Sequence, residues 1–247
     1  MKHDLSNVTF VIPYHRDSDD REENFHCIIK YLFDNFETNI VVVEEGKKHP
    51  MPVLPIQNYD RQYKFVPYHI DGIFYRTKVI NEGIKLVKTP YLCIYDADVI
   101  MPPEQYVAAR DRLLGSDVVY PYGGHFYDID RSYIKDGIIK EHRSYAVNSV
   151  GGAVFMRTDI YWEAGLENQN IVGWGHEDNE RYKRMQILEY NIARVDGPCY
   201  HISHQRGINS SNKNPYDAAN AKEWDRIRMM RKNVLQEEIK SWTWCQR

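Results

Sequence analysis

Three short segments of the 247-residue chain carry side chains that could hold a metal ion and move a proton. The first is Asp96-Ala97-Asp98, two carboxylates one residue apart after an apolar stretch. Such a pair can hold a hard divalent cation and a sugar hydroxyl. A cation bound there can neutralise a diphosphate, which is otherwise a poor leaving group at neutral pH. Because Asp-x-Asp is also common in solvated turns, the apolar stretch before it is what favours a functional role.

The second segment runs from Gly173 to Glu180 and combines closely spaced glycines, Trp174 and three carboxylates. Glycine lets a ligand approach the backbone, and the indole offers an apolar face to a sugar. The carboxylates also suit the first turn of a helix, where they interact favourably with the helix dipole. Both interpretations can hold together, with Glu177 and Glu180 serving the helix and Asp178 the chemistry.

The third segment is His201-Ile202-Ser203-His204. Histidines three positions apart can share a metal on a helix or a turn, whereas on a straight strand they face opposite sides. Pro198 just before and Gly207 just after the segment favour a turn. An isolated pair of this kind is more often structural, so its importance depends on the carboxylates elsewhere in the chain.

The elements that must position these segments are clearest in the first half. Short apolar runs, typical of parallel strands buried on both faces, predict strands at residues 8–12, 39–43, 64–70 and 91–95. Helical spacing predicts one helix that begins with a solvated charge cluster at 17–23 and a second helix over 76–87. This alternation predicts an α/β fold with a mostly parallel, doubly wound sheet flanked by helices. Ligands of such sheets bind beyond the carboxyl ends of the strands, where Asp96 and Asp98 fall.

The second half of the chain is less regular. Strands are expected at residues 118–120 and 192–195 and within 144–157, a helix over about 177–190, and one long helix over 216–239. No internal repeat or linker interrupts the pattern, which favours a single domain over 1–247.

Composition excludes several classes of protein. The 32 Lys and Arg residues against 35 Asp and Glu leave a net charge of −3, which disfavours a nucleic-acid partner. No apolar run reaches the roughly 18–20 residues of a membrane span, and the first residues lack a signal-peptide core. The 4 cysteines are scattered without a CxxC pair, which indicates reduced thiols and a soluble, cytoplasmic protein.

Together, these segments resemble a glycosyltransferase of the GT-A fold, most closely the inverting β1,4-galactosyltransferase family and its bacterial and chondroitin-synthase relatives. The resemblance covers roughly residues 8 to 230, and its most specific part is Gly173 to Asp178. The matching landmarks are Val11-Ile12-Pro13-Tyr14, Phe74-Tyr75-Arg76-Thr77-Lys78 with Asn81 and Gly83, Asp96-Ala97-Asp98, Gly151-Gly152, Gly173-Trp174-Gly175-His176-Glu177-Asp178 and Cys199-Tyr200-His201-Ile202-Ser203-His204. It implies a nucleotide-binding half over about 8–100, an acceptor and catalytic half over about 101–210, and a C-terminal helical segment over about 216–240.

The resemblance also implies roles for single residues. Asp178 would be the general base, with Glu177 as the first substitute, and Trp174 would touch both donor and acceptor. The metal ligands would be Asp98, His201 and His204. Position 201 is a methionine in the vertebrate members, and histidine is the more usual ligand for manganese-like ions. The nucleotide would lie against Pro13, Tyr14, Arg16, Phe74, Arg76, Asp96 and Asp98. The sugars would contact Ser149, Gly151, Gly152, Trp174, Gly175 and Glu177.

Two departures from the family pattern bear on the donor. The nucleotide loop is Pro13-Tyr14-His15-Arg16-Asp17, in which Arg16 is the one family cation that survives, shifted by one position. Ser149 stands where the vertebrate members have a large aromatic residue that crowds the sugar C2 substituent. A serine leaves room for an N-acetyl group, unless Tyr145 fills the same space.

The resemblance therefore implies an inverting, metal-dependent transfer of Gal or GalNAc from a UDP-sugar to a glycan hydroxyl, with Mn²⁺ or another divalent cation. We expect a cytoplasmic role in bacterial surface polysaccharide synthesis, with peripheral association with the inner membrane left open. Two alternatives remain. Haloacid-dehalogenase-like phosphatases also have Asp-x-Asp after a strand, but usually near the N-terminus and with Thr or Val where this chain has Ile100. The other is a sugar-nucleotide-binding module without turnover.

Overall fold

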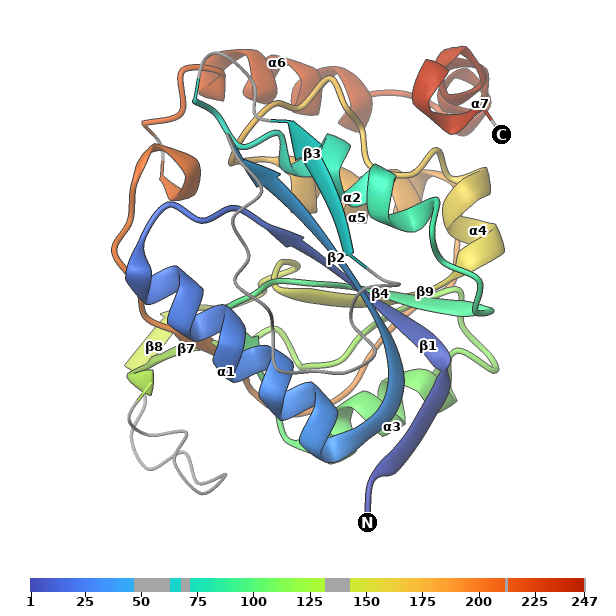
Figure 1. The fold of residues 1–247 in the computed structure, drawn as a ribbon. Helices are drawn as coiled ribbons and strands as arrows, with labels where there is room; N and C mark the ends of the chain where they lie inside the picture. Colours follow the sequence, from blue (N-terminus) through green and yellow to red (C-terminus); the bar gives the residue numbers. More distant parts are fainter. Residues whose placement is uncertain (47–62, 68–71, 132–142, 212, 247) are drawn as a thin grey trace.

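The computed structural model describes residues 1–46, 63–67, 72–131, 143–211 and 213–246. Two sheets form its framework (Figure 1). A 7-stranded sheet has the order β10-β6-β9-β4-β1-β2-β3, and a 4-stranded sheet has the order β5-β11-β7-β8. The strands are β1 (His3–Tyr14), β2 (Phe36–Gly46), β3 (Tyr63–Pro67), β4 (Tyr91–Tyr95), β5 (Val99–Ile100), β6 (Val118–Tyr120), β7 (Phe126–Ile129), β8 (Arg143–Ala146), β9 (Ala153–Arg157), β10 (Ile192–Arg194) and β11 (Cys199–Ile202). The α-helices are α1 (Asp19–Asn35), α2 (Arg76–Ile84), α3 (Pro103–Arg112), α4 (Thr158–Glu163), α5 (Glu177–Ile187), α6 (Asp217–Arg228) and α7 (Lys232–Ser241).

The larger sheet is mostly parallel, which confirms the α/β class predicted from the sequence. Strand β1 runs parallel to β2 and β4, β2 to β3, and β10 to β6. Strand β9 lies antiparallel between β4 and β6, with Ala153 opposite Tyr95. This reversal brings Gly151 and Gly152, which precede β9, to the carboxyl end of β4. The backbone N–H of Asp96 donates to the Gly152 carbonyl at 2.8 Å.

Helices cover both faces of this sheet, as a doubly wound fold requires. On one face Gly83 of α2 lies so close to β1 that a Cβ there would be 2.6 Å from Val11 Cγ1. On the other face the ring of Tyr14 stacks on Phe25 of α1, with ring centroids 4.4 Å apart. Because side chains alternate along a strand, odd and even positions of β1 face different helices.

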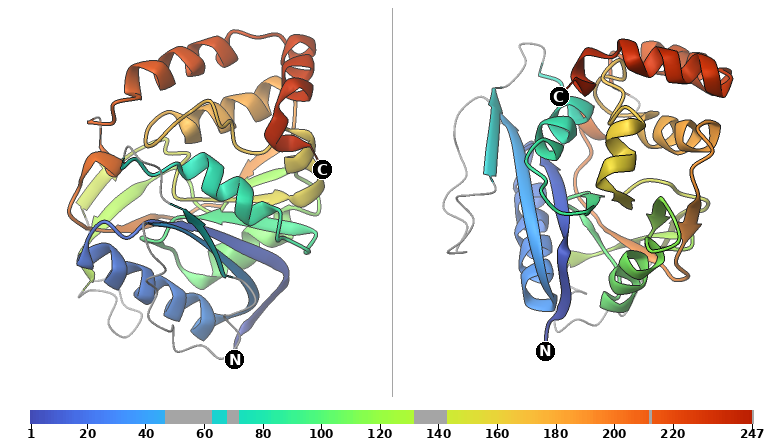
Figure 2. Two further views of the ribbon diagram at one scale, coloured as in Figure 1. Left: turned by 45° about the horizontal axis from the view of Figure 1, so that its top comes forward. Right: turned by 90° about the vertical axis from the view of Figure 1, so that its right-hand side faces the viewer.

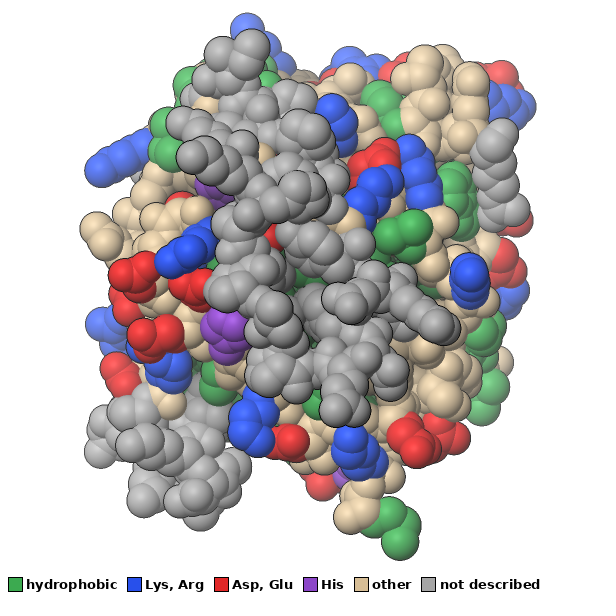
Figure 3. All heavy atoms as spheres, in the orientation of Figure 1, with side chains coloured by type: hydrophobic (Ala, Val, Ile, Leu, Met, Phe, Trp, Pro, Cys, Tyr) green, Lys and Arg blue, Asp and Glu red, His purple; other side chains and the backbone are tan. Residues whose placement is uncertain are grey.

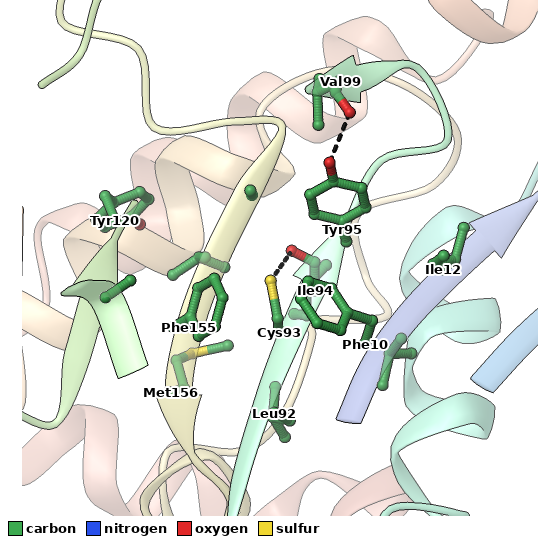
Figure 4. Close-up of a cluster of buried hydrophobic side chains, with 14 of the residues drawn as sticks. Phe10, Ile12, Leu92, Cys93, Ile94, Tyr95, Val99, Tyr120, Phe155 and Met156 are labelled. Atoms are coloured by element: carbon green, nitrogen blue, oxygen red, sulfur yellow. Dashed lines mark hydrogen bonds between the residues drawn. The ribbon is translucent and has the colours of Figure 1, made fainter. Parts of the chain in front are cut away.

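Aromatic rings and aliphatic side chains together form the core around β4 (Figure 4). The ring of Phe10 makes edge contacts with Tyr95 and Phe155. The buried Tyr95 hydroxyl donates to the Val99 carbonyl at 2.6 Å, across the turn. This hydrogen bond joins the end of β4 to β5 and fixes the loop between them.

The structure corrects several local expectations. The smaller sheet was not anticipated, because its strands are short and lack a long apolar run. Of the segment 201–204, for which a turn was favoured, His201 and Ile202 belong to strand β11. The strand expected over 64–70 is observed as Tyr63–Pro67, while 68–71 lie outside the described residues. The single helix expected over 216–239 is two helices, α6 and α7. The chain is extended at Arg231, between the two helices, and Ile239 of α7 and Trp242 just beyond it pack closely on Gly165.

Helices α6 and α7 lie at the end of the molecule away from the N-terminus (Figure 2). The face shown in Figure 3 carries acidic and basic side chains interspersed over its described part. Among the described helices, none combines the length and the apolar character needed to pass through a lipid bilayer.

Candidate active site

A cavity of about 410 Å³ opens at the carboxyl ends of β1 and β4. Most of the residues singled out from the sequence lie in its wall, although they come from segments far apart in the chain. They are Pro13, Tyr14, Phe74, Arg76, Asp96, Asp98, Ser149, Gly151, Gly152, Trp174, Asp178, His201 and His204. Three others, Arg16, Gly175 and Glu177, are not among the described residues that line it.

Strand pairing brings the histidines to the Asp-x-Asp turn. His201 of β11 is paired with Val99 of β5, and the Ile202 N–H donates to the Asp98 carbonyl at 2.7 Å. After Ile202 the chain leaves the strand, and the Ser203 N–H donates to the Ile129 carbonyl at 2.9 Å. This departure returns His204 to the side on which His201 lies, which a continued strand would not allow.

The carboxylate of Asp98 and the two imidazoles form a group that could hold a metal ion. One potential ligand atom from each residue lies within 4.8 Å of the others. The Nε2 atoms of His204 and His201 are 3.2 and 3.8 Å from Asp98 Oδ2. Burial by itself would raise the pKa of Asp98, but His204, His201 and Arg21 together lower it below its usual range.

The hydrogen bonds of the two histidines fit metal binding. His204 Nδ1 lies 2.8 Å from the Gln205 carbonyl, which can only accept, so Nδ1 carries the proton. His201 Nδ1 lies 2.7 Å from Asp128 Oδ1 and donates in the same way. Both Nε2 atoms therefore face Asp98. As imidazolium ions they stabilise its carboxylate, and as neutral imidazoles they would offer their lone pairs to a cation. A carboxylate that orients a histidine through its other nitrogen is the usual outer partner of a metal-bound histidine.

Arg21 of α1 is a residue of the site that the sequence interpretation missed. Its guanidinium lies 3.5 Å from Asp98 Oδ2 and 3.3 Å from His204 Nε2. Arg21 therefore places a positive charge beside both of these atoms. The expectation that residues 17–23 form a solvated first turn is therefore wrong for Arg21. Arg16, the cation predicted to contact the nucleotide, forms a 2.8 Å ion pair with Glu22.

Asp178 stands on the first turn of α5 and lines the same cavity. Its Oδ1 accepts a hydrogen bond from Arg181 Nη2. Its Oδ2 lies beside Gly151, where a Cβ would be only 2.7 Å away. Arg76 lies between this carboxylate and the Asp-x-Asp turn, because Nη1 is 3.7 Å from Asp178 Oδ1 and Nη2 binds Asp96.

Glu177 shapes the loop that carries Trp174. Its Oε2 accepts the Gly175 N–H at 2.7 Å, and Gly175 has a φ of +110°, which glycine adopts readily. Burial, together with the charge of Asp178, raises the pKa of Glu177 to about 7. Trp174 itself is 37% exposed at the cavity wall. The two neighbouring carboxylates thus differ, since Glu177 faces the backbone and Asp178 faces the cavity.

Residues 139–205 match a family model described as the N-terminal domain of galactosyltransferase. The match confirms the resemblance for that part of the chain, which contains Gly151, Asp178 and both histidines. A search of curated protein sequences finds no match.

Solved structures similar to the chain include two of Drosophila β1,4-galactosyltransferase 7. One is its catalytic domain with xylobiose, at 16% identity and a TM-score of 0.45, covering 78% of this chain and 64% of that one. The other is a mutant with manganese, UDP-Gal and xylobiose, at 15% identity and a TM-score of 0.47, covering 85% of this chain and 69% of that one. The chain thus spans less than two thirds of the length of the first structure.

Proposed function

We propose that the chain is an inverting, metal-dependent glycosyltransferase of the GT-A type that moves a hexose from a UDP-sugar to a hydroxyl of a glycan acceptor. One observation carries the proposal. A single cavity is lined both by Asp178, which can act as a base, and by the group Asp98, His201 and His204, which could hold a metal ion. Asp178 and both histidines fall within the stretch that matches the galactosyltransferase model.

The residues of the cavity divide the chemistry between them. Asp178 accepts the proton of the acceptor hydroxyl as that oxygen attacks the anomeric carbon. Arg76 and Arg21 bring positive charge to the region that receives the diphosphate. A divalent cation held by Asp98, His201 and His204 would supply further neutralisation of the leaving UDP. A single displacement inverts the anomeric centre, so an α-linked donor yields a β-linked product.

We further propose that the donor sugar is Gal or GalNAc and that Ser149 admits the N-acetyl group. Ser149 Oγ is 3.3 Å from the Tyr122 hydroxyl and 3.3 Å from the Gly151 N–H, at the cavity wall. A small side chain there excludes less than an aromatic ring would, and steric exclusion is a simple means of rejecting a larger donor. The side chain of Tyr145, the other residue considered for this space, lies outside the described part.

Donor choice is tested by comparing kcat/KM for UDP-GalNAc and UDP-Gal. We expect UDP-GalNAc to be used at least as well, and Ser149→Tyr to reduce its use more than that of UDP-Gal. A preference of the wild type for UDP-Gal above about tenfold, or about 1.4 kcal/mol, would contradict the role of Ser149.

The setting of the reaction is also a proposal. We propose a growing bacterial surface polysaccharide as the acceptor and the cytoplasm as the location. The 4 cysteines, Cys27, Cys93, Cys199 and Cys245, are free, as a reducing compartment favours.

The decisive experiment measures UDP release from UDP-Gal, UDP-GalNAc, UDP-Glc and UDP-GlcNAc with Mn²⁺ or with EDTA, alone and with a panel of p-nitrophenyl glycosides. We expect Mn²⁺-dependent release, a β-linked product by NMR, and a loss of about 10²–10⁴-fold in kcat for Asp178→Asn with UDP binding retained. Phosphate release from p-nitrophenyl phosphate would favour a phosphatase. Binding of UDP-sugar and Mn²⁺ without any turnover would favour a binding module.

A further inference from the structure

We infer that Arg181 is a positioning residue for Asp178, which it holds so that one carboxylate oxygen faces the cavity. The inference rests on the proposed function, in which Asp178 is the general base. Arg181 follows Asp178 by three positions on α5, so both side chains leave the same side of the helix.

The guanidinium of Arg181 is held from behind by a buried carboxylate. Its side chain is 2% exposed, and its Nη1 donates to Glu167 Oε1 at 2.9 Å. Glu167, 1% exposed, also accepts a hydrogen bond from the Tyr161 hydroxyl. The backbone of Glu167 is fixed in turn, because its N–H donates to Asn81 Oδ1 at 2.8 Å and its carbonyl accepts from Asn81 Nδ2 at 2.9 Å.

The other end of the same guanidinium determines how Asp178 lies. Arg181 Nη2 donates to Asp178 Oδ1, which leaves Oδ2 beside Gly151 in the wall of the cavity. The guanidinium is a rigid planar fork, so the position of Glu167 is transmitted to the carboxylate of Asp178. A base must be held within about 0.5 Å and 10–20° of its working geometry, which a free side chain does not ensure.

A second buried arginine on α5 provides the comparison. Arg184 is fully buried, and its donors are used by Glu180 and by the carbonyls of Ala164 and Leu166. It ties the helix to the preceding loop. Arg181 and Arg184 thus share burial, helix and charge, but Arg181 is the one that reaches a carboxylate of the cavity.

The test removes each buried arginine together with its carboxylate partner, because an unpaired buried charge would destabilise the fold. The variants are Arg181→Met with Glu167→Gln and, as the matched control, Arg184→Met with Glu180→Gln. For each we would measure the melting temperature, the Kd for UDP with Mn²⁺, and kcat and KM for Mn²⁺-dependent UDP release from UDP-Gal.

We expect the Arg181 pair to lower kcat about 10–100-fold, as a displaced base does, with KM for UDP-Gal within about twofold. The Arg184 pair should lose comparable stability but keep kcat within about threefold. Arg181→Lys, with Glu167 retained, should have a kcat between those of the Arg181 pair and the wild type. A lysine keeps the charge but cannot bridge two carboxylates as a fork. Equal losses in the two pairs, or a loss under about threefold in the Arg181 pair, would overturn the inference.

Two further measurements separate this inference from the proposed function. Retained turnover in Asp178→Asn would refute Asp178 as the base, whatever the arginine variants do. A crystal structure of the Arg181 pair tests positioning without any assay. We expect the Asp178 carboxylate to leave Gly151 or to take several rotamers, and an unchanged, single conformation would overturn the inference.

Discussion

At the scale of single residues, the metal group makes a quantitative prediction about His204. Its Nδ1 is used by the Gln205 carbonyl, and its Nε2 faces Asp98. His204→Ala should raise the Kd for Mn²⁺ in the presence of UDP by more than about 100-fold. Loss of a residue that only hydrogen-bonds to a metal ligand typically costs about 10–100-fold in metal affinity, so a larger loss indicates a direct ligand. Electron paramagnetic resonance of free Mn²⁺ measures this directly. His125→Ala is the control, because His125 is exposed and lines a different cavity. Unchanged Mn²⁺ affinity in His204→Ala would remove this residue from the site.

A second residue-scale prediction concerns Glu177 and pH. Burial, followed by the charge of Asp178, raises the pKa of Glu177 to about 7, against 4.5 for an ordinary glutamate. The folded state therefore binds this proton more tightly than the unfolded chain does. Its contribution to stability is complete below about pH 4.5 and is lost as the pH rises through about 7.

Glu177→Gln should remove this loss, because the amide oxygen can still accept the Gly175 N–H. We expect the variant to exceed the wild type in free energy of unfolding at pH 8 by about 2 kcal/mol and to match it more closely at pH 5. Urea unfolding at the two pH values measures the difference, with the exposed Glu104→Gln as control. A wild type and a Glu177→Gln variant with the same pH dependence would contradict the prediction.

At the scale of elements, the position of α2 depends on Gly83. A Cβ at this residue would lie 2.6 Å from Val11 Cγ1 and 2.9 Å from Val43 Cγ2, on two strands of the sheet. Gly83→Ala should destabilise the protein by about 1–3 kcal/mol, despite the better helix propensity of alanine, because β-branched side chains in a strand cannot move aside. Gly115→Ala is the matched control, since open space surrounds that position. Thermal unfolding measures the stability of both variants. Equal stabilities of Gly83→Ala and Gly115→Ala would contradict close packing of α2 on the sheet.

At the scale of the whole molecule, the cavity joins the two sheets. Asp96 follows β4 of the larger sheet, whereas His201 belongs to β11 of the smaller one. A ligand that contacts both should stabilise the fold by about 2.7 kcal/mol at 100 times its Kd. We expect UDP with Mn²⁺ to raise Tm by more than the sum of the separate shifts, and Asp98→Ala to abolish that excess. If EDTA left the rise in Tm caused by UDP and Mn²⁺ unchanged, nucleotide binding would not involve a metal at Asp98, His201 and His204.

Much of this organisation follows from local sequence. The apolar runs predicted β1, β2, β4 and β6, and the placement of Asp96 and Asp98 after β4 followed from the rule for parallel sheets. The helix that begins at Glu177 was expected from its acidic first turn. These features depend on neighbours within a few positions, because strand burial, helix periodicity and capping are properties of short segments.

The tertiary structure alone decided which side chains meet in the cavity. Arg21 reaches His204 across 183 positions, and Asp128 reaches His201 across 73. Neither pair could be predicted from a local pattern, because residues 17–23 were interpreted as a solvated helix start and no element was predicted around Asp128. The sequence by itself determined the elements and the chemical types available at their ends. The packing of the two sheets determined their distances and partners, since contacts between distant segments depend on how buried surfaces fit together.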